Sequence, residues 1–331
     1  MSHISGELML FAAKVLILFL FIVGLLVTII ALVAKNRGRN QNRLIVNHLN
    51  EKYDEMKEIL SENILPKKEY KKYLKAQKKA RQAKEKCEYQ KNNVYVLDFD
   101  GDMKASAVSD LREAITALLQ IVTEQDEVVL RLESPGGLVP NYGLAAAQLI
   151  RLRKRNIPLT IIIDKVAASG GYLMACTGCK ILAAPFAIIG SIGVVMQLPN
   201  FHRLLKNKNV DYVQLTAGDH KRTVTMFGEN TKAGETKAQE ELEAVHQSFK
   251  NLIQTYRQTI DIKKIATGEY WLGEQALHLN LIDAIQTSDD YLFEKSKIAE
   301  IYEIQHESKK SFLSKIPFLS SALTRIFHHI A

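Results

Sequence analysis

Ser169 is the residue whose neighbours best suit a nucleophile. It lies in Ala167-Ala168-Ser169-Gly170-Gly171, after a predicted strand and before a short apolar helix that runs to about Thr177. The glycines let the backbone turn sharply and let a carbonyl group approach closely. Free N–H groups at the start of the helix favour a developing oxyanion. A serine that caps the helix would have the same neighbours, so this motif alone leaves both readings open.

A second glycine-flanked turn, Ser134-Pro135-Gly136-Gly137, ends the preceding predicted strand. Read alone, this sequence is an ordinary turn. The ends of neighbouring parallel strands meet at one edge of a sheet, so we expect it beside the Ser169 turn. Its unshielded N–H groups suit the second donor of an oxyanion hole, and the pair of turns favours a serine nucleophile.

A serine nucleophile needs a base, and the candidates lie in Gly218-Asp219-His220-Lys221-Arg222. This segment follows a strand-like stretch, Asp211–Leu215. Either His220 or Lys221 could accept the serine proton, and their spacing does not choose between them.

The segment that carries these turns alternates strands with helices. Such alternation predicts βαβ units, a mostly parallel sheet with right-handed crossovers and an α/β fold. Ile181–Gln197 is apolar but interrupted by proline and glycine, which favours buried sheet over a membrane span. The predicted strands are Val94–Asp98, Val128–Leu132 and Leu159–Asp164, and the predicted helices are Ser109–Val122 and Tyr142–Lys154.

The positive charge of the chain is concentrated in one segment. Residues 35–91 contain 17 Lys and Arg against 8 Asp and Glu, whereas residues 92–331 contain 26 against 27. A diffusely basic domain that binds nucleic acid is therefore disfavoured. The 331 residues are 47% hydrophobic, which is typical of a globular protein, and 3 cysteines exclude a disulfide scaffold. Cys176 and Cys179 have no second pair for zinc, so we expect core packing and neither a metal nor a cofactor.

The N-terminus predicts a membrane anchor over residues 1–34. Val15–Ala34 has no charged residue, and a helix of that length is about 30 Å long, the thickness of a bilayer core. A cleaved signal peptide would have a shorter apolar region and a small-residue cleavage site. The basic residues after Ala34 place the rest of the chain in the cytoplasm by the positive-inside rule.

Three further segments complete the expected organisation. Residues 35–91 predict a basic helical spacer that lifts the next domain off the membrane or contacts anionic lipid headgroups. Residues 92–290 form the catalytic domain. Residues 291–331 form a tail whose last part is basic and amphipathic.

Five segments, in order along the chain, resemble the signature segments of membrane-anchored Ser–Lys peptidases of the signal peptide peptidase A family. The anchor and the basic spacer resemble its SohB branch. The resemblance covers nearly the whole chain, least securely after about Asp290. The five segments are Glu133–Gly137, Asp164–Tyr172, Gly190–Val194, Gly218–Thr223 and Thr267–Ala276.

The resemblance implies a ClpP/crotonase-like fold, with Ser169 as nucleophile and Lys221 as general base. It also implies that Gly136 or Gly137, together with Gly170, forms the oxyanion hole. Ser191, in Gly-Ser-Ile-Gly, matches a second hydroxyl that contacts the lysine in family members.

Two positions depart from the family pattern. His220 stands where the family has an aromatic residue, which leaves a Ser–His pair open. Glu269-Tyr270 stands where the family has arginine after Thr-Gly, so local substrate contacts are not carried over.

The implied function is that of a serine endopeptidase, tethered to the cytoplasmic (inner) membrane, that forms an acyl-enzyme and cleaves hydrophobic or signal-peptide-like peptides. The family also implies a homo-oligomer. Its better-known members work outside the cytoplasm, which leaves the side of the membrane open. The alternatives are a catalytically silent membrane scaffold and an acyl-CoA enzyme of the crotonase type.

A lysine base makes a demand on the structure. Lysine has an ordinary pKa of about 10.4 and is almost wholly protonated at neutral pH. Burial disfavours the ammonium and lowers the pKa. We therefore expect the Lys221 amine in an apolar pocket, unpaired with Asp219 or Glu229.

Overall fold

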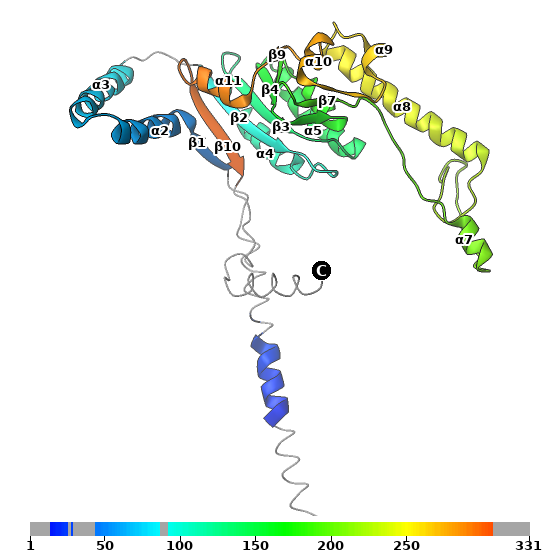
Figure 1. The fold of residues 1–331 in the computed structure, drawn as a ribbon. Coiled ribbons are helices and arrows are strands. Elements are labelled where there is room, and N and C mark those ends of the chain that lie inside the picture. The colour runs from blue at the N-terminus through cyan, green and yellow to red at the C-terminus, as the bar shows by residue number, and fades with distance from the viewer. Residues whose placement is uncertain (1–13, 26–27, 29–43, 87–91, 307–331) are drawn as a thin grey trace, which may run out of the picture. The chain divides into compact units, whose positions relative to one another are not determined.

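The computed structural model describes residues 14–25, 28, 44–86 and 92–306 (Figure 1). Of these, residues 46–305 belong to one compact unit, and residues 14–25, 28, 44–45 and 306 belong to a second. Residues 14–25 are helical. Among the described helices, none is both long enough and apolar enough to cross a membrane. Most of the second half of the predicted span Val15–Ala34, and the predicted tail beyond His306, lie outside the described residues.

A seven-stranded sheet forms the centre of the compact unit, in the order β1-β10-β2-β3-β4-β6-β9 (Figure 1). The pairs from β10 across to β9 are all parallel, as the alternation of strands and helices predicts. The α/β class is confirmed. The strands are β1 (Leu44–His48), β2 (Asn93–Asp100), β3 (Glu127–Glu133), β4 (Leu159–Ile163), β6 (Lys180–Ala183), β9 (Ala284–Ile285) and β10 (Glu300–His306).

A smaller sheet joins the end of β3 and leads into the Ser169 turn. It consists of β5 (Val166–Ala168), β7 (Ile188–Gly190) and β8 (Tyr270–Leu272). The pair β5–β7 is parallel and the pair β7–β8 is antiparallel. A parallel bridge between Ser134 and Ala167 connects β5 to the chain just beyond β3. This bridge brings the two glycine-flanked turns side by side.

Helices cover both faces of the large sheet. Alternate side chains of β2 join different core clusters, since Tyr95, Leu97 and Phe99 pack in one and Val94 and Val96 in the other. The first cluster also contains buried side chains of α4, α5, α6 and α8, and the second those of α2 and α11. The bounds are α2 (Leu49–Ile64), α4 (Val108–Leu118), α5 (Val139–Arg153), α6 (Gly170–Ala175), α8 (Lys232–Tyr256), α9 (Ile262–Ile265), α10 (Gly273–His278) and α11 (Ser288–Lys295).

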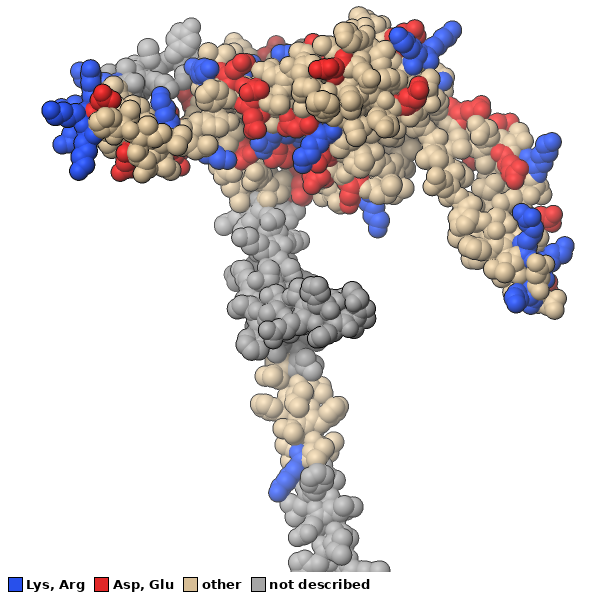
Figure 2. Space-filling view, in the orientation of Figure 1, with Lys and Arg blue, Asp and Glu red and all other residues tan. Residues whose placement is uncertain are grey.

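Two strands of the large sheet come from outside the predicted catalytic domain of residues 92–290. β1 lies in the segment predicted as a helical spacer, and β10 lies in the segment predicted as a tail. Their strand conformation depends on pairing with segments far away in the sequence, which local patterns do not reveal. The rest of the spacer is helical through α2 and α3 (Lys67–Lys86). Figure 2 shows basic side chains gathered over α3, where Lys67, Lys68, Lys71, Lys72, Lys75, Lys78 and Lys79 are exposed.

The segment after β7 differs from its prediction. Within Ile181–Gln197, most of β6 and β7 is buried, but Phe186 is exposed, and from Val195 onward the side chains are exposed as well. Asp211–Leu215 is not a strand, and residues 194–231 contain only one short helix, α7 (His202–Asn207). Many apolar side chains of this segment are exposed. A local pattern typical of a strand therefore does not form a strand here.

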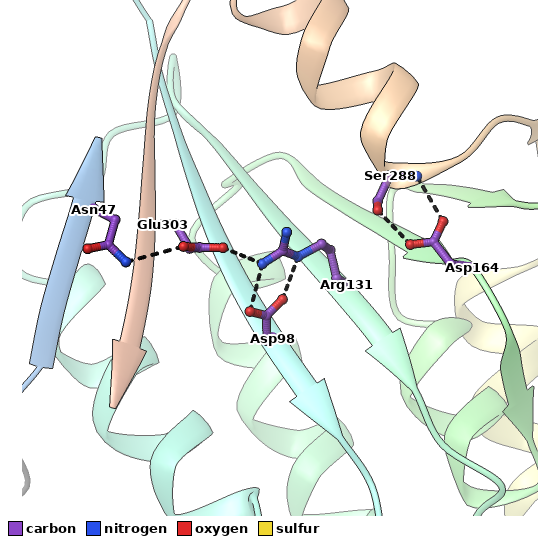
Figure 3. Close-up of polar contacts among 6 residues, drawn as sticks. All are labelled: Asn47, Asp98, Arg131, Asp164, Ser288 and Glu303. Atoms are coloured by element: carbon purple, nitrogen blue, oxygen red, sulfur yellow. Dashed lines mark hydrogen bonds and ion pairs between the residues drawn. The ribbon is translucent and has the colours of Figure 1, made fainter. Parts of the chain in front are cut away.

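An ionic network ties four strands of the large sheet together (Figure 3). Arg131 on β3 donates to both carboxylate oxygens of Asp98 on β2, at 2.5 and 2.7 Å, and to Glu303 on β10. Asn47 on β1 donates to the same Glu303 at 3.3 Å. Burial opposes the charge of Arg131, but the two carboxylates raise its pKa. The network thus fastens β1 and β10 to the sheet.

We expect Arg131→Met to lower the free energy of unfolding by about 2 kcal/mol or more, because Glu303 would lose its cationic partner. The Glu303 side chain is only 11% exposed, so water replaces that partner poorly. Urea unfolding measures the effect. The double variant Arg131→Met with Glu303→Gln should recover part of the loss, and losses that simply add would contradict this account.

Candidate active site

Ser169 occupies a strained turn between β5 and α6. Its backbone has φ 51° and ψ −117°, a conformation that costs a non-glycine residue about 1–3 kcal/mol. Two backbone hydrogen bonds hold it, since its N–H donates to the Gly190 carbonyl at 2.8 Å and its carbonyl accepts from Leu173 at 3.0 Å. Strain that the surrounding structure maintains in this way is typical of functional sites.

The Ser169 hydroxyl does not cap α6, because its side chain makes no capping hydrogen bond to the helix. The residue is half-buried. Since the capping role is not used, the alternative that the Ser-Gly-Gly pattern left open is wrong.

The turn of Gly136 and Gly137 lies against Ser169, as predicted. A Cβ atom on Gly136 would lie 2.8 Å from the Cβ of Ser169 and 2.7 Å from the N of Gly170. Gly136 also has φ +87°, which other residues rarely adopt. The first N–H groups of a helix have no partner within it, and Gly170 begins α6. A carbonyl oxygen of a substrate could therefore receive hydrogen bonds from both turns.

Two buried hydroxyl groups lie beneath the glycine turn, and the sequence analysis assigned neither a role. Ser134 Oγ lies 2.6 Å from Tyr142 Oη on α5, and both side chains are fully buried. The Gly136 N–H donates to Ser134 Oγ at 3.1 Å. Ser134 lay within a recognised motif, but nothing in the sequence linked it to a tyrosine eight residues later.

Ser191 is connected to Ser169 through Gly190. Gly190, whose carbonyl binds the Ser169 N–H, precedes it directly. Ser191 has φ 49°, and its N–H donates to the Glu269 carbonyl at 2.6 Å. The Glu269 carboxylate accepts from the Thr267 hydroxyl at 2.7 Å. Glu269, which departs from the family pattern, is thus a direct hydrogen-bond partner of Ser191.

Lys221 and His220 lie in a different part of the compact unit, in the segment 194–231. Both are exposed, and within the described part of the chain Lys221 forms no ion pair with Asp219 or Glu229. The nearby Thr223 carbonyl packs against Gly234, near the start of α8. Phe249 and Ile253, near the other end of α8, are buried in the core.

Nineteen residues separate Gly234 from Ile253, or about 28 Å of helix. This length holds the segment that carries Lys221 away from the core (Figure 1). Among the residues that the structure describes, Lys221 is exposed and does not lie in the apolar pocket expected around its amine.

Cys176 is buried in the core, where burial raises the pKa of its thiol to about 12. Cys179 is exposed. Among the described residues no group of histidine, cysteine and acidic side chains is arranged to bind a metal ion.

Comparison with known proteins identifies the family. The model of the N-terminal part of peptidase family S49 matches residues 4–149, and the model of peptidase family S49 matches residues 151–301. A probable protease SohB of Haemophilus influenzae is 46% identical over 311 residues, which cover 89% of this chain and 88% of that protein. A probable protease SohB of Buchnera aphidicola subsp. Schlechtendalia chinensis is 45% identical over 298 residues, which cover 86% of this chain and 97% of that protein.

A solved structure that the chain resembles is that of 1510-N, a membrane-bound stomatin-specific protease in complex with a substrate peptide. It has 16% sequence identity and a TM-score of 0.46, and the match covers 69% of this chain and 98% of that chain. The family models and the two SohB relatives confirm the resemblance that the five motifs predicted. The chain therefore belongs to peptidase family S49, in its SohB branch.

Proposed function

We propose that the protein is a serine endopeptidase of ClpP/crotonase-like fold that cleaves peptides through an acyl-enzyme formed on Ser169. The observation that carries this proposal is the strained, uncapped Ser169 with the Gly136-Gly137 turn against it. The hydroxyl oxygen attacks the carbonyl carbon of the substrate as its proton passes to a base. One N–H from Gly136 or Gly137 and one from Gly170 bind the resulting oxyanion.

Lys221 is the proposed base, and it acts on Ser169 of a neighbouring copy of the chain. The unprotonated amine takes the hydroxyl proton and later donates it to the leaving amine, after which water releases the acyl group. The length of α8 and the exposure of Lys221 support a site completed between copies. Ser191, one residue beyond the carbonyl that holds Ser169, is the proposed second hydroxyl beside the lysine.

Exposed apolar side chains in the segment that carries Lys221 support the homo-oligomer. Val195, Val213 and Leu215 are 75%, 78% and 92% exposed. Contiguous apolar patches mark interfaces between proteins, and we propose that these side chains belong to one. A neighbouring copy would cover them and remove water from around the Lys221 amine, which a lysine base requires.

The proposed substrates are hydrophobic or signal-peptide-like peptides near a lipid bilayer. Met103 and Leu138 are 66% and 49% exposed beside the glycine turn, and the Leu138 N–H donates to the Met103 carbonyl. They offer apolar contacts to a bound peptide. The uncharged sequence Val15–Ala34 supports an anchor in the cytoplasmic membrane.

A fluorophosphonate probe tests this function, because it reacts with an activated serine. We expect covalent labelling of Ser169 in the full chain, abolished in both Ser169→Ala and Lys221→Ala. A peptide map of the labelled protein identifies the modified residue. Labelling that survives Lys221→Ala but not His220→Ala would show that His220, and not Lys221, is the base. A wild-type protein that takes no label would favour a silent scaffold.

A further inference from the structure

We propose that the hydroxyl groups of Ser134 and Tyr142 are positioning groups that order the glycine turn, so that Gly137, and not Gly136, supplies the oxyanion-binding N–H beside Gly170. This inference rests on the proposed function, because it concerns the same reaction. Neither hydroxyl would touch the substrate. Both act through the backbone of the turn.

The direction of each hydrogen bond follows from the partners. Tyr142 Oη donates to the backbone carbonyl of Asp102 at 2.7 Å, since a carbonyl has no proton to give. Because that bond uses the only hydroxyl proton of Tyr142, Ser134 must be the donor in the 2.6 Å hydrogen bond between the two hydroxyls. Ser134 Oγ in turn accepts from the Gly136 N–H. Burial raises the pKa of Tyr142, which keeps this phenol protonated.

This chain of hydrogen bonds decides between the two glycines. The Gly136 N–H is occupied and points toward the interior, and Gly136 itself is buried. The Gly137 N–H has no hydrogen-bond partner among residues 44–86 and 92–306, and Gly137 is half-exposed. An oxyanion needs a donor that is both free and accessible. Gly137 meets both conditions, whereas Gly136 packs against Ser169.

Close packing encloses the two hydroxyls. A Cβ atom on Gly101 would lie 2.4 Å from Ser134 Oγ and 2.6 Å from Tyr142 Oη. On Gly170 it would lie 2.4 Å from the ring of Tyr142. Hydrogen bonds in such a dry setting are strong and reinforce one another. The same tyrosine therefore packs against one proposed oxyanion donor and orders the loop of the other.

Tyr142→Phe tests the proposal, because it removes one oxygen and leaves the ring against Gly170. With the fluorophosphonate probe and the full chain, we expect the maximal rate of Ser169 labelling to fall about tenfold. A misplaced oxyanion donor is expected to cost less than a deleted one, which typically costs about 10²–10³-fold. The probe concentration for half-maximal rate should change less than about twofold, because the loop is ordered for the transition state.

Tyr172→Phe is the matched control. Tyr172 is equally buried, and its hydroxyl also donates to a backbone carbonyl, that of Leu281, at 2.9 Å. It lies outside the chain of hydrogen bonds that ends at the glycine turn. We expect both variants to lower the melting temperature by similar amounts, but only Tyr142→Phe to slow labelling. Equal labelling rates in the two variants would overturn the proposal.

Ser134→Ala and the double variant supply a second test. Because the two hydroxyls act as one chain, the double variant should label no more than about twofold more slowly than Ser134→Ala alone. Losses that multiply would show independent, merely structural roles and overturn the proposal. If the wild-type protein takes no label, the proposed function itself fails. If the wild-type protein is labelled and Tyr142→Phe is labelled at the same rate, only the role of the two hydroxyls fails.

Discussion

A one-to-one mixture of Ser169→Ala and Lys221→Ala proteins, each inactive alone, is expected to regain about a quarter of the wild-type activity. The reason is geometric, because α8 holds the segment of Lys221 away from the core of its own chain. In a ring built from one repeated interface, random mixing places an intact serine opposite an intact lysine at about one interface in four. Each variant alone should lose more than about 10³-fold in rate.

Co-expression of the two variants with different tags allows the measurement. Hydrolysis of a fluorogenic peptide gives the rate, and the fluorophosphonate should label only the Lys221→Ala copy, which still has Ser169. The control replaces that copy with the double variant Ser169→Ala with Lys221→Ala, and this mixture should remain inactive. If the tagged copies co-purify but no activity returns, Lys221 does not act between chains.

The parts of the fold that were predictable from the sequence are those with strong local patterns. Largely apolar runs such as Val128–Leu132 and Leu159–Asp164 became the buried strands β3 and β4, and a glycine-flanked turn follows β3 as expected. β1, at the edge of the sheet, and β10, beside it, were missed, because both strands are stabilised by partners far away in the sequence. Arg131 and Glu303, 172 residues apart, are one such pairing.

The candidate site also has parts that were predictable from the sequence and parts that were not. That the two turns lie together was predictable from the alternation of strands and helices, but the short strand β5 and its bridge to Ser134, which bring them together, were not. The contact between Ser134 and Tyr142 was not, since it depends on how α5 packs against the sheet. The position of Lys221 was also not predictable, because the exposed segment 194–231 has few contacts in a single chain to determine its course.

Gly136→Ala is expected to lower the turnover number by about 10²–10³-fold, the usual effect of losing one oxyanion donor. Gly136 has φ +87°, and its added methyl group would lie 2.7 Å from the Ala168 carbonyl oxygen and 2.7 Å from the N of Gly170. These are backbone atoms on the segment that holds Ser169, so the turn itself must move away. The displaced turn carries the Gly137 N–H out of reach of the substrate oxygen.

Gly143→Ala on α5 is the control for this substitution. A Cβ atom there would meet nothing within 4 Å, and alanine stabilises a helix by up to about 1 kcal/mol relative to glycine. We expect Gly143→Ala to keep the wild-type turnover number and melting temperature or to raise the latter slightly. Steady-state kinetics and thermal unfolding of both variants separate a local defect in the turn from general loss of structure. A Gly136→Ala protein that turns over at the wild-type rate would exclude this turn from the oxyanion hole.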